Sequence, residues 1–116
     1  MVRVIFVFLF VEHPSFTKQV TDLFTDEEFR RFQADLAASP TAGDVIPGLG
    51  GLRKLRWGAK GKGKRGGARF IYLVIPKPGI IYLFYVYTKG EITDMSAEQK
   101  RRMTRAIKEI KEEFKK

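Results

Sequence analysis

The sequence contains no cysteine and only one histidine, His13. The lack of cysteine excludes disulfide bonds, thiolate catalysis and cysteine-ligated metal sites, and it fits a reducing compartment such as the cytoplasm. With a single histidine, neither a histidine pair for acid–base chemistry nor a histidine metal site can form. We therefore expect no metal ion and no cofactor, and we interpret His13, which precedes a proline, as an incidental surface residue.

A long hydrophobic run is also missing. The run near the start of the sequence, Val4 to Val11, has eight apolar residues, whereas a membrane-spanning helix needs about 20. The run is rich in β-branched and aromatic residues, and Glu12-His13-Pro14 follows it in place of a small-residue cleavage site. We interpret it as a buried strand, with an export signal as the alternative, and expect no membrane partner.

Acidic residues are absent from the middle of the chain. Residues 1–44 carry four Lys/Arg and seven Asp/Glu, residues 45–90 carry ten Lys/Arg and no acid, and residues 91–116 carry eight and six. The net charge of +9 therefore arises in the middle segment. A surplus of this size indicates a polyanionic partner, and without carboxylates this segment offers no ligands for a nuclease-type metal site.

The 116 residues suffice for one domain over residues 1–116, and 44% hydrophobic residues suffice for its core. Capping boxes begin helices at Thr25 and at Ser96, and a hairpin turn occupies residues 76–79. Residues 43–51 read as an irregular loop. The expected fold is α+β, in the order β-α-α-β-β-β-α, with helices packed on a mostly antiparallel sheet. The expected strands are residues 2–11, 52–57, 68–75 and 80–88, and the expected helices are residues 15–23, 25–38 and 96–114.

The loop from Gly58 to Gly67 contains part of a Walker phosphate-binding motif and part of a dinucleotide-binding motif. Neither has its required context, because Arg65 stands where the Walker motif needs Ser or Thr, and a strand follows where both need a helix. We interpret the loop as a cationic finger for RNA phosphates, with a solvated connection as the alternative. Its RNA-binding residues are Lys60, Lys62, Lys64 and Arg65.

Alternation in the strand at residues 52–57 puts Leu52, Lys54 and Arg56 on one face and Arg53, Leu55 and Trp57 on the other. Together with Arg69 and Lys89 from the next two strands, Lys54 and Arg56 could converge on one concave face. Arg53 is added to the RNA-binding residues. The alternative is that each cation is an edge residue with its charge in water.

Four tyrosines lie in the last two strands: Tyr72, Tyr82, Tyr85 and Tyr87. Alternation predicts that Tyr85 and Tyr87 share one face of their strand and that Tyr82 lies on the other. Most tyrosines in such strands belong to the core, but one or two could stack on a base.

Three segments, residues 43–57, 61–72 and 82–91, resemble the RelE/HigB toxin superfamily, most closely its HigB branch. The resemblance extends from about Phe16 to Arg105. It implies a compact fold like that of microbial RNases, in agreement with the element order above.

The resemblance further implies a type II toxin, an endoribonuclease (mRNA interferase) that cleaves mRNA in the decoding site of the small ribosomal subunit. The implied partner is a cognate helix-turn-helix antitoxin of the HigA type, which holds the toxin inactive. By similarity, Lys54 and Arg56 are the paired cations, Arg69 steadies the scissile phosphate, and Lys89 is the last basic residue. Gly90 and Ser96 stand where RelE has an arginine and a tyrosine, so the proton-accepting group stays open.

RNA carries its own nucleophile, the ribose 2′-hydroxyl, so such a site needs positioning, proton transfer and charge stabilisation. Arg69 suits phosphate stabilisation because its planar guanidinium grips phosphate oxygens. Neighbouring cations disfavour a charged lysine, which makes Lys54 the candidate general base. The alternatives are Tyr87 and a group of the RNA or of the ribosome. The rival functions are a non-catalytic RNA- or ribosome-binding module, a DNA-binding domain and a peripheral membrane protein, the last two being less well supported.

Overall fold

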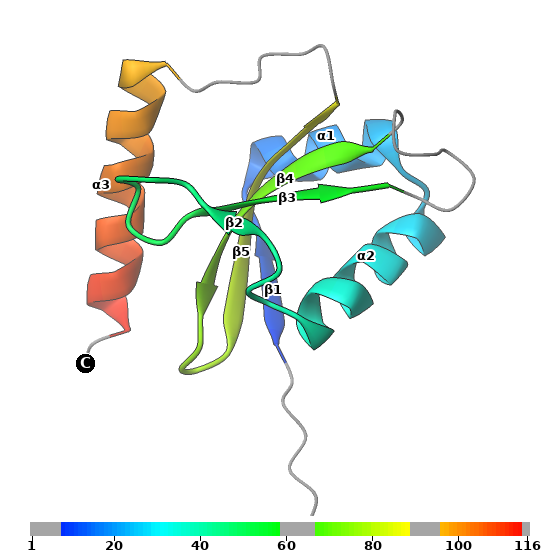
Figure 1. Cartoon of the computed structure of the whole chain (residues 1–116), viewed down its shortest axis with the longest axis horizontal. Coiled ribbons are helices and arrows are strands. Elements are labelled where there is room, and N and C mark those ends of the chain that lie inside the picture. Colours follow the sequence, from blue (N-terminus) through cyan, green and yellow to red (C-terminus); the bar gives the residue numbers. More distant parts are fainter. Residues whose placement is uncertain (1–7, 59–66, 89–95, 115–116) are drawn as a thin grey trace, which may run out of the picture.

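The computed structural model describes residues 8–58, 67–88 and 96–114, which form three helices around one sheet (Figure 1). In chain order the elements are β1 (Leu9–Glu12), α1 (Pro14–Leu23), α2 (Asp26–Ala38), β2 (Asp44–Val45), β3 (Arg53–Trp57), β4 (Ala68–Ile75), β5 (Ile80–Thr88) and α3 (Ala97–Glu113).

The strands form a five-stranded sheet in the order β1-β5-β4-β3-β2. The β1–β5 pair is parallel, and the other three pairs are antiparallel. A tight turn at residues 76–79 joins β4 to β5, and Gly79 adopts there a φ of 96°, which glycine tolerates because it has no Cβ. The expected α+β fold with a mostly antiparallel sheet is confirmed.

Both predicted capping boxes are present. The Thr25 hydroxyl accepts a hydrogen bond from the Glu28 amide, and the Glu28 carboxylate accepts one from the Thr25 amide. Ser96 and Gln99 make the same reciprocal pair at the start of α3. These bonds satisfy amides that the first helical turn leaves unpaired, so the helix starts are defined locally.

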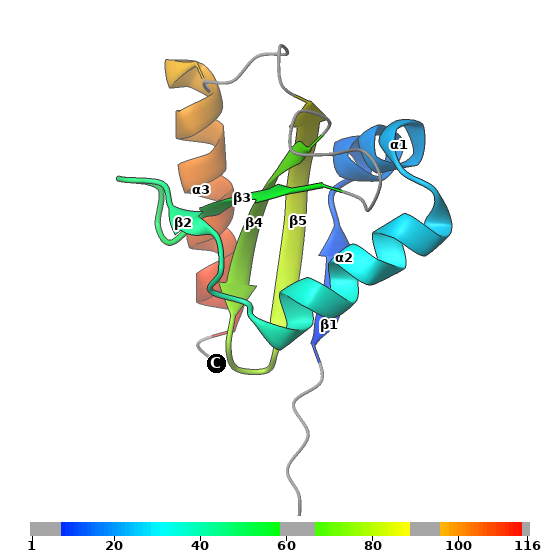
Figure 2. The ribbon, with the colours of Figure 1, turned by 45° about the vertical axis from the view of Figure 1, so that its right-hand side comes forward.

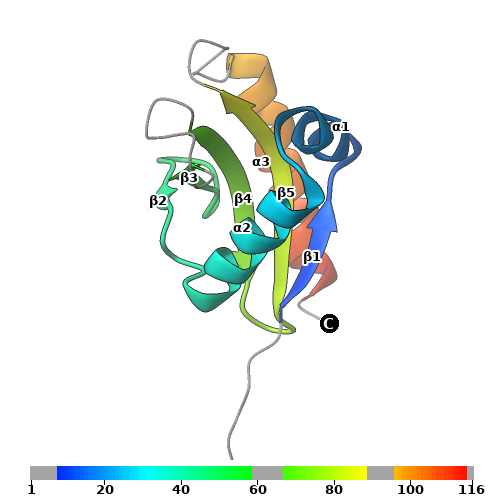
Figure 3. The same cartoon turned by 90° about the vertical axis from the view of Figure 1, so that its right-hand side faces the viewer.

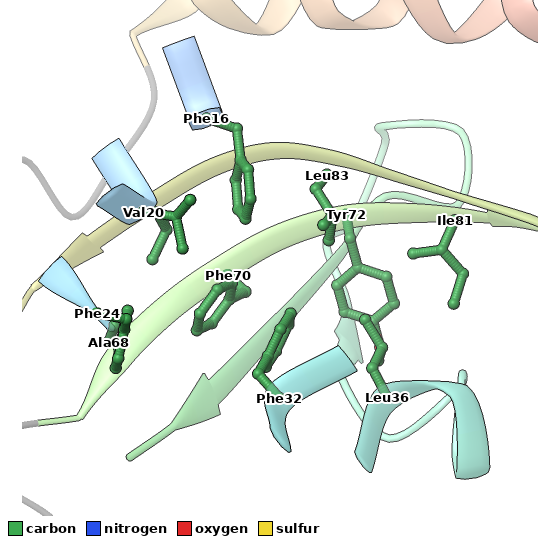
Figure 4. Close-up of a cluster of buried hydrophobic side chains, with 11 residues drawn as sticks. Phe16, Val20, Phe24, Phe32, Leu36, Ala68, Phe70, Tyr72, Ile81 and Leu83 are labelled. Atoms are coloured by element: carbon green, nitrogen blue, oxygen red, sulfur yellow. The ribbon is translucent and has the colours of Figure 1, made fainter. Parts of the chain in front are cut away.

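One face of the sheet is covered by α1 and α2 and holds an aromatic core (Figure 4). Phe70 of β4 lies at its centre: its ring stacks on Phe32 of α2 with centroids 3.7 Å apart, and it also contacts the rings of Phe16, Phe24 and Trp57. Burial of these rings anchors both helices to β3 and β4.

The other face carries α3, which lies across the sheet from α1 and α2 (Figures 1 and 2). Met103 and Ile107 are the buried residues of α3. They pack with apolar residues of the β2–β3 loop and of the sheet: Leu49, Leu52, Ile71, Leu73, Ile75, Ile80 and Phe84. Of the predicted helix stripe, Ile110 and Phe114 are partly buried at the margin of this cluster.

The predicted placement of Tyr82 is wrong. The β4–β5 register shifts between Ile71 and Tyr72, because Ile71 pairs with Tyr85 whereas Tyr72 pairs with Leu83, so Phe84 is an extra residue on β5. Such a bulge reverses the alternation along the strand. Tyr82 therefore packs in the same α3-side cluster as Tyr85 and Tyr87.

Two further expectations differ in detail. The segment at residues 43–51, expected to be irregular, contains β2, a two-residue strand paired with Arg53 and Lys54. The strand expected at residues 2–11 is observed as Leu9–Glu12, and residues 2–7 of that prediction lie outside the described residues.

The β5 strand extends beyond the end of β1, and α1 lies beside this part of it (Figure 3). There the side-chain oxygen of Gln19 in α1 accepts a hydrogen bond from the Val86 amide at 3.1 Å. A helix side chain thus occupies a ladder position that no strand fills. No helix among the described residues is both long and apolar enough to cross a membrane.

Candidate active site

The sheet register brings three of the predicted site residues into one row. Arg56 of β3 pairs directly with Arg69 of β4, and Arg69 pairs directly with Tyr87 of β5. Directly paired residues of an antiparallel sheet point to the same face, and Tyr87 borders the α3-side cluster. We call Arg56, Arg69 and Tyr87 the arginine row.

A second row lies beside it on the same face: Lys54, Ile71 and Tyr85 are paired across β3, β4 and β5. Ile71 is buried under α3, whereas Lys54 is exposed. The α3 face is thus apolar from Ile71 to Ile75 and cationic at Arg69, one alternation further along β4. The alternation of β3 correctly predicts that Lys54, Arg56 and Arg69 share a face; their chemical roles remain predictions.

The arginine row places two like charges opposite each other, at Arg56 and Arg69. Like charges placed directly opposite each other on neighbouring strands destabilise a sheet. In addition, Nη1 of Arg69 is buried and has no hydrogen-bond partner among the described residues. A buried donor without an acceptor is costly. An anion placed over this row would relieve both conditions, and the guanidinium geometry suits phosphate oxygens.

An acidic residue that the sequence pattern did not predict, Asp44, faces Lys54. Asp44 of β2 pairs directly with Lys54, and both are exposed. Opposite charges on directly paired residues of neighbouring strands favour the pairing. Asp44 went unnoticed because β2 is only two residues long and Asp44 lies one position before the acid-free segment.

Arg53 does not belong to this face. It points to the α2 side, where its Nη1 donates hydrogen bonds to the Gly43 carbonyl at 2.7 Å and to the Thr41 carbonyl at 3.2 Å. The same segment is held by Tyr72, whose hydroxyl donates to the Pro40 carbonyl and accepts from the Gly43 amide. Arg53 therefore fastens the chain that enters β2, and its role in RNA binding remains a prediction.

Burial of the phenol raises the pKa of Tyr72, while the Gly43 amide and the Arg53 charge act in the opposite direction. Its ring leaves no room at Gly43, where a Cβ would lie 2.7 Å from the Tyr72 hydroxyl oxygen. Glycine is therefore required at position 43 for close approach to Tyr72.

His13 is an exposed residue, as expected, but it has a structural function. It caps the start of α1, where its Nδ1 accepts a hydrogen bond from the Ser15 amide at 3.2 Å. Its ring also lies 6.3 Å, centroid to centroid, from that of Tyr85.

Five predicted site residues, Lys60, Lys62, Lys64, Arg65 and Lys89, lie outside the described residues. Their roles remain predictions. Within the described ranges, no three His, Asp or Glu side chains gather in a way that could hold a metal ion.

Two solved structures of one bacterial toxin resemble this chain in fold. A structure of E. coli toxin RelE in the free state, a double arginine-to-alanine mutant, matches with a TM-score of 0.59 and 17% identity, over 83% of this chain and 97% of that chain. A chain of the intact E. coli RelBE toxin–antitoxin complex matches with a TM-score of 0.55 and 16% identity, over 73% of this chain and 100% of that chain. This chain has the RelE fold. No protein-family model matches the sequence.

The RelE fold accounts for how the arginine row is assembled. Its antiparallel β3–β4–β5 core sets Arg56, Arg69 and Tyr87 side by side although they lie far apart in the sequence. The expected superfamily fold is thus confirmed, whereas assignment to the HigB branch remains a prediction.

Proposed function

We propose that this chain is a ribosome-dependent endoribonuclease that cleaves mRNA and acts as the toxin of a toxin–antitoxin pair. The RelE fold supports a toxin of this kind. The observation that carries the proposal is the arginine row, in which Arg69 pairs directly with Arg56 and has a buried guanidinium nitrogen with no acceptor among residues 8–58, 67–88 and 96–114. A phosphate of the RNA would supply the missing acceptor.

The nucleophile of the reaction comes from the RNA itself. The ribose 2′-oxygen loses its proton and attacks the adjacent phosphorus, the bond from phosphorus to the 5′-oxygen breaks, and that oxygen takes up a proton. The products are a 2′,3′-cyclic phosphate and a free 5′-hydroxyl. Negative charge grows on the phosphate oxygens in the transition state, where preorganised donors stabilise it most.

Arg69 stabilises this negative charge on the phosphate oxygens, and Arg56 binds the same phosphate beside it. Three groups could accept the proton from the 2′-hydroxyl: Lys54, Tyr87 of the row, and the Asp44 carboxylate that faces Lys54. Replacing the true acceptor should remove the acidic limb of the pH–rate profile, so Asp44→Asn and Lys54→Met distinguish these two candidates.

Lys89 would be a further catalytic cation. The loop cations would bind RNA away from the reacting phosphate: Lys60, Lys62, Lys64 and Arg65. Their partners would be mRNA and the small ribosomal subunit. A cognate helix-turn-helix antitoxin of the HigA type would block the site, and the place of action would be the cytoplasm.

Primer extension on a translated message, with purified protein in a translation extract, tests the proposal. We expect discrete cleavage with a free 5′-hydroxyl on the downstream fragment, and little or no cleavage of the same RNA without ribosomes. An intact message together with ribosome binding would refute the enzyme and leave a non-catalytic RNA- or ribosome-binding module.

A further inference from the structure

An aromatic pair borders the arginine row. The rings of His13 and Tyr85 lie 6.3 Å apart, centroid to centroid, at an angle of 47°. Tyr85 lies two residues before Tyr87 on β5 and on the same face, so it is a diagonal neighbour of Arg69. Diagonal neighbours in a sheet are about 7–8 Å apart, within reach of aromatic and long side chains.

His13 lies beside Tyr85 because the chain continues its parallel pairing with β5 for one residue beyond the end of β1. The His13 amide donates to the Leu83 carbonyl at 3.0 Å, one residue after Glu12 pairs with Leu83. By alternation from Val11, which packs at the margin of the α3-side cluster, His13 points to the same face as Tyr85. The second row therefore runs Lys54, Ile71, Tyr85 and then His13.

Tyr85 borders the α3-side cluster, but packing does not account for the ring of His13 beside it. The rings around Phe70 on the opposite face belong to a continuous core, whereas His13 is exposed and Tyr85 is only partly buried. The N-cap of α1 uses only Nδ1 of His13. Asn and Ser are at least as good at this position, so capping alone does not require an imidazole ring.

We propose that His13 and Tyr85 form a stacking subsite for one unpaired base of the bound RNA, next to the phosphate held by Arg69. Single-stranded RNA is commonly bound by an aromatic side chain under a base and cations on its backbone. Here the two groups stand on adjacent rows of one sheet face. The inference rests on the proposed function, because it assumes that Arg69 binds an RNA phosphate.

The subsite should bind all four bases, but with different affinities. Every base has a π-face, so all four can stack, and a purine with its larger ring surface should be held more tightly than a pyrimidine. Nε2 of His13, which the cap does not use, adds a hydrogen-bonding group for a base edge.

Fluorescence anisotropy with a short single-stranded RNA at low salt tests the subsite, using a series in which each nucleotide in turn is abasic. We expect one abasic position to weaken binding to the purified full-length protein. Tyr85→Leu should weaken binding of the intact RNA by about tenfold and should not respond further to that abasic position, since stacking is already lost.

His13→Asn removes the ring but keeps an N-capping side chain, so its smaller loss of affinity should come without a loss of thermal stability. The matched control is Tyr82→Leu, because Tyr82 lies on the same face but stacks on Phe84, with centroids 6.2 Å apart, away from the arginine row. It should bind like the wild type.

The inference is overturned if Tyr85→Leu binds the intact RNA as tightly as the wild type, or if its loss is the same at every abasic position. These results are separable from failure of the proposed function. If wild-type protein does not cleave a translated message, the enzyme is refuted, while the abasic series still reports whether a base stacks on Tyr85.

Discussion

The two faces of the sheet differ in what their neighbouring residues contribute. On the α1–α2 face, Phe70 is fully buried among aromatic rings, and packing with these rings stabilises the folded state. On the α3 face, Arg69 is set against Arg56, and one of its guanidinium nitrogens is buried without an acceptor in the described part of the chain. Residues 69 and 70 are adjacent in β4, so one strand contributes to the core on one side and carries the proposed phosphate ligand on the other.

This contrast indicates why the site needs the aromatic core. A row of like charges costs stability, and functional sites commonly carry such costs, which the rest of the fold offsets. The dense packing behind β3 and β4 holds Arg56 and Arg69 in register although their charges repel each other. The comparison predicts opposite effects on stability for substitutions at neighbouring positions.

The largest effect is expected on the core side. Phe70→Ala should lower the free energy of unfolding by about 3–5 kcal/mol, because it leaves a cavity among the rings of α1, α2 and β3. Urea denaturation followed by circular dichroism measures this. A loss below about 1 kcal/mol would contradict the role of this face as the stabilising one.

Arg69→Ala should act on cleavage, at a cost of about 3 kcal/mol or roughly a hundredfold in rate, because Arg69 meets charge that develops in the transition state. Primer extension over a time course of translation gives the rate, and co-sedimentation gives ribosome association, which should change far less. The matched control is Lys77→Ala, which removes one exposed cation at the β4–β5 turn and should leave the rate unchanged.

Tyr72→Phe should cost about 1–3 kcal/mol of stability, because the Gly43 amide and the Pro40 carbonyl both lose a buried partner. The pH dependence adds a sharper test. Burial raises the pKa of Tyr72 above its ordinary value of 10.0, so its contribution is fully present below pH 10 and is lost as the pH rises through the higher native value.

Denaturation at pH 8 and at increasing pH above 10 should therefore show a steeper alkaline loss in the wild type than in Tyr72→Phe. Some loss persists in the variant, because burial, with a contribution from Glu113, also raises the pKa of Tyr82. Identical slopes for the two proteins would show that the Tyr72 phenol is not held in its protonated form by the fold.

The smallest expected effect is a gain, not a loss, in the free energy of unfolding. Arg69→Met keeps an unbranched side chain but removes the repulsion with Arg56 and the unpaired donor, so it should raise the free energy of unfolding by about 1 kcal/mol. Thermal unfolding in parallel with the cleavage assay measures both quantities. A variant that is less stable than the wild type would mean that Arg69 contributes to the fold.

Local signals predicted much of this fold. The bounds of β4 and β5 and the capping boxes at Thr25 and Ser96 follow from short-range pattern and side chain–backbone chemistry. The shared face of Lys54, Arg56 and Arg69 follows from strand alternation once the hairpin order is known. These features need no knowledge of distant contacts.

The features that were missed depend on tertiary contacts. The bulge at Phe84 reverses the direction of Tyr82 and has no local signature. The pairing of Asp44 with Lys54 needs a two-residue strand that forms by pairing with β3. Arg53 has the sequence character of a phosphate ligand, and only the path of residues 40–43 shows that its guanidinium is used internally.

The bond from the Val86 amide to Gln19 has a consequence for self-association. Exposed strand edges are templates on which a second chain can add by backbone pairing, and here a helix side chain closes that part of the β5 edge. In the part of the chain that the structure describes, the outermost strands are β1 with four residues and β2 with two. Gln19→Leu would leave the Val86 amide without this acceptor and expose the edge of β5. Concentrated solutions of that variant should therefore form amyloid-like aggregates sooner than solutions of the wild type.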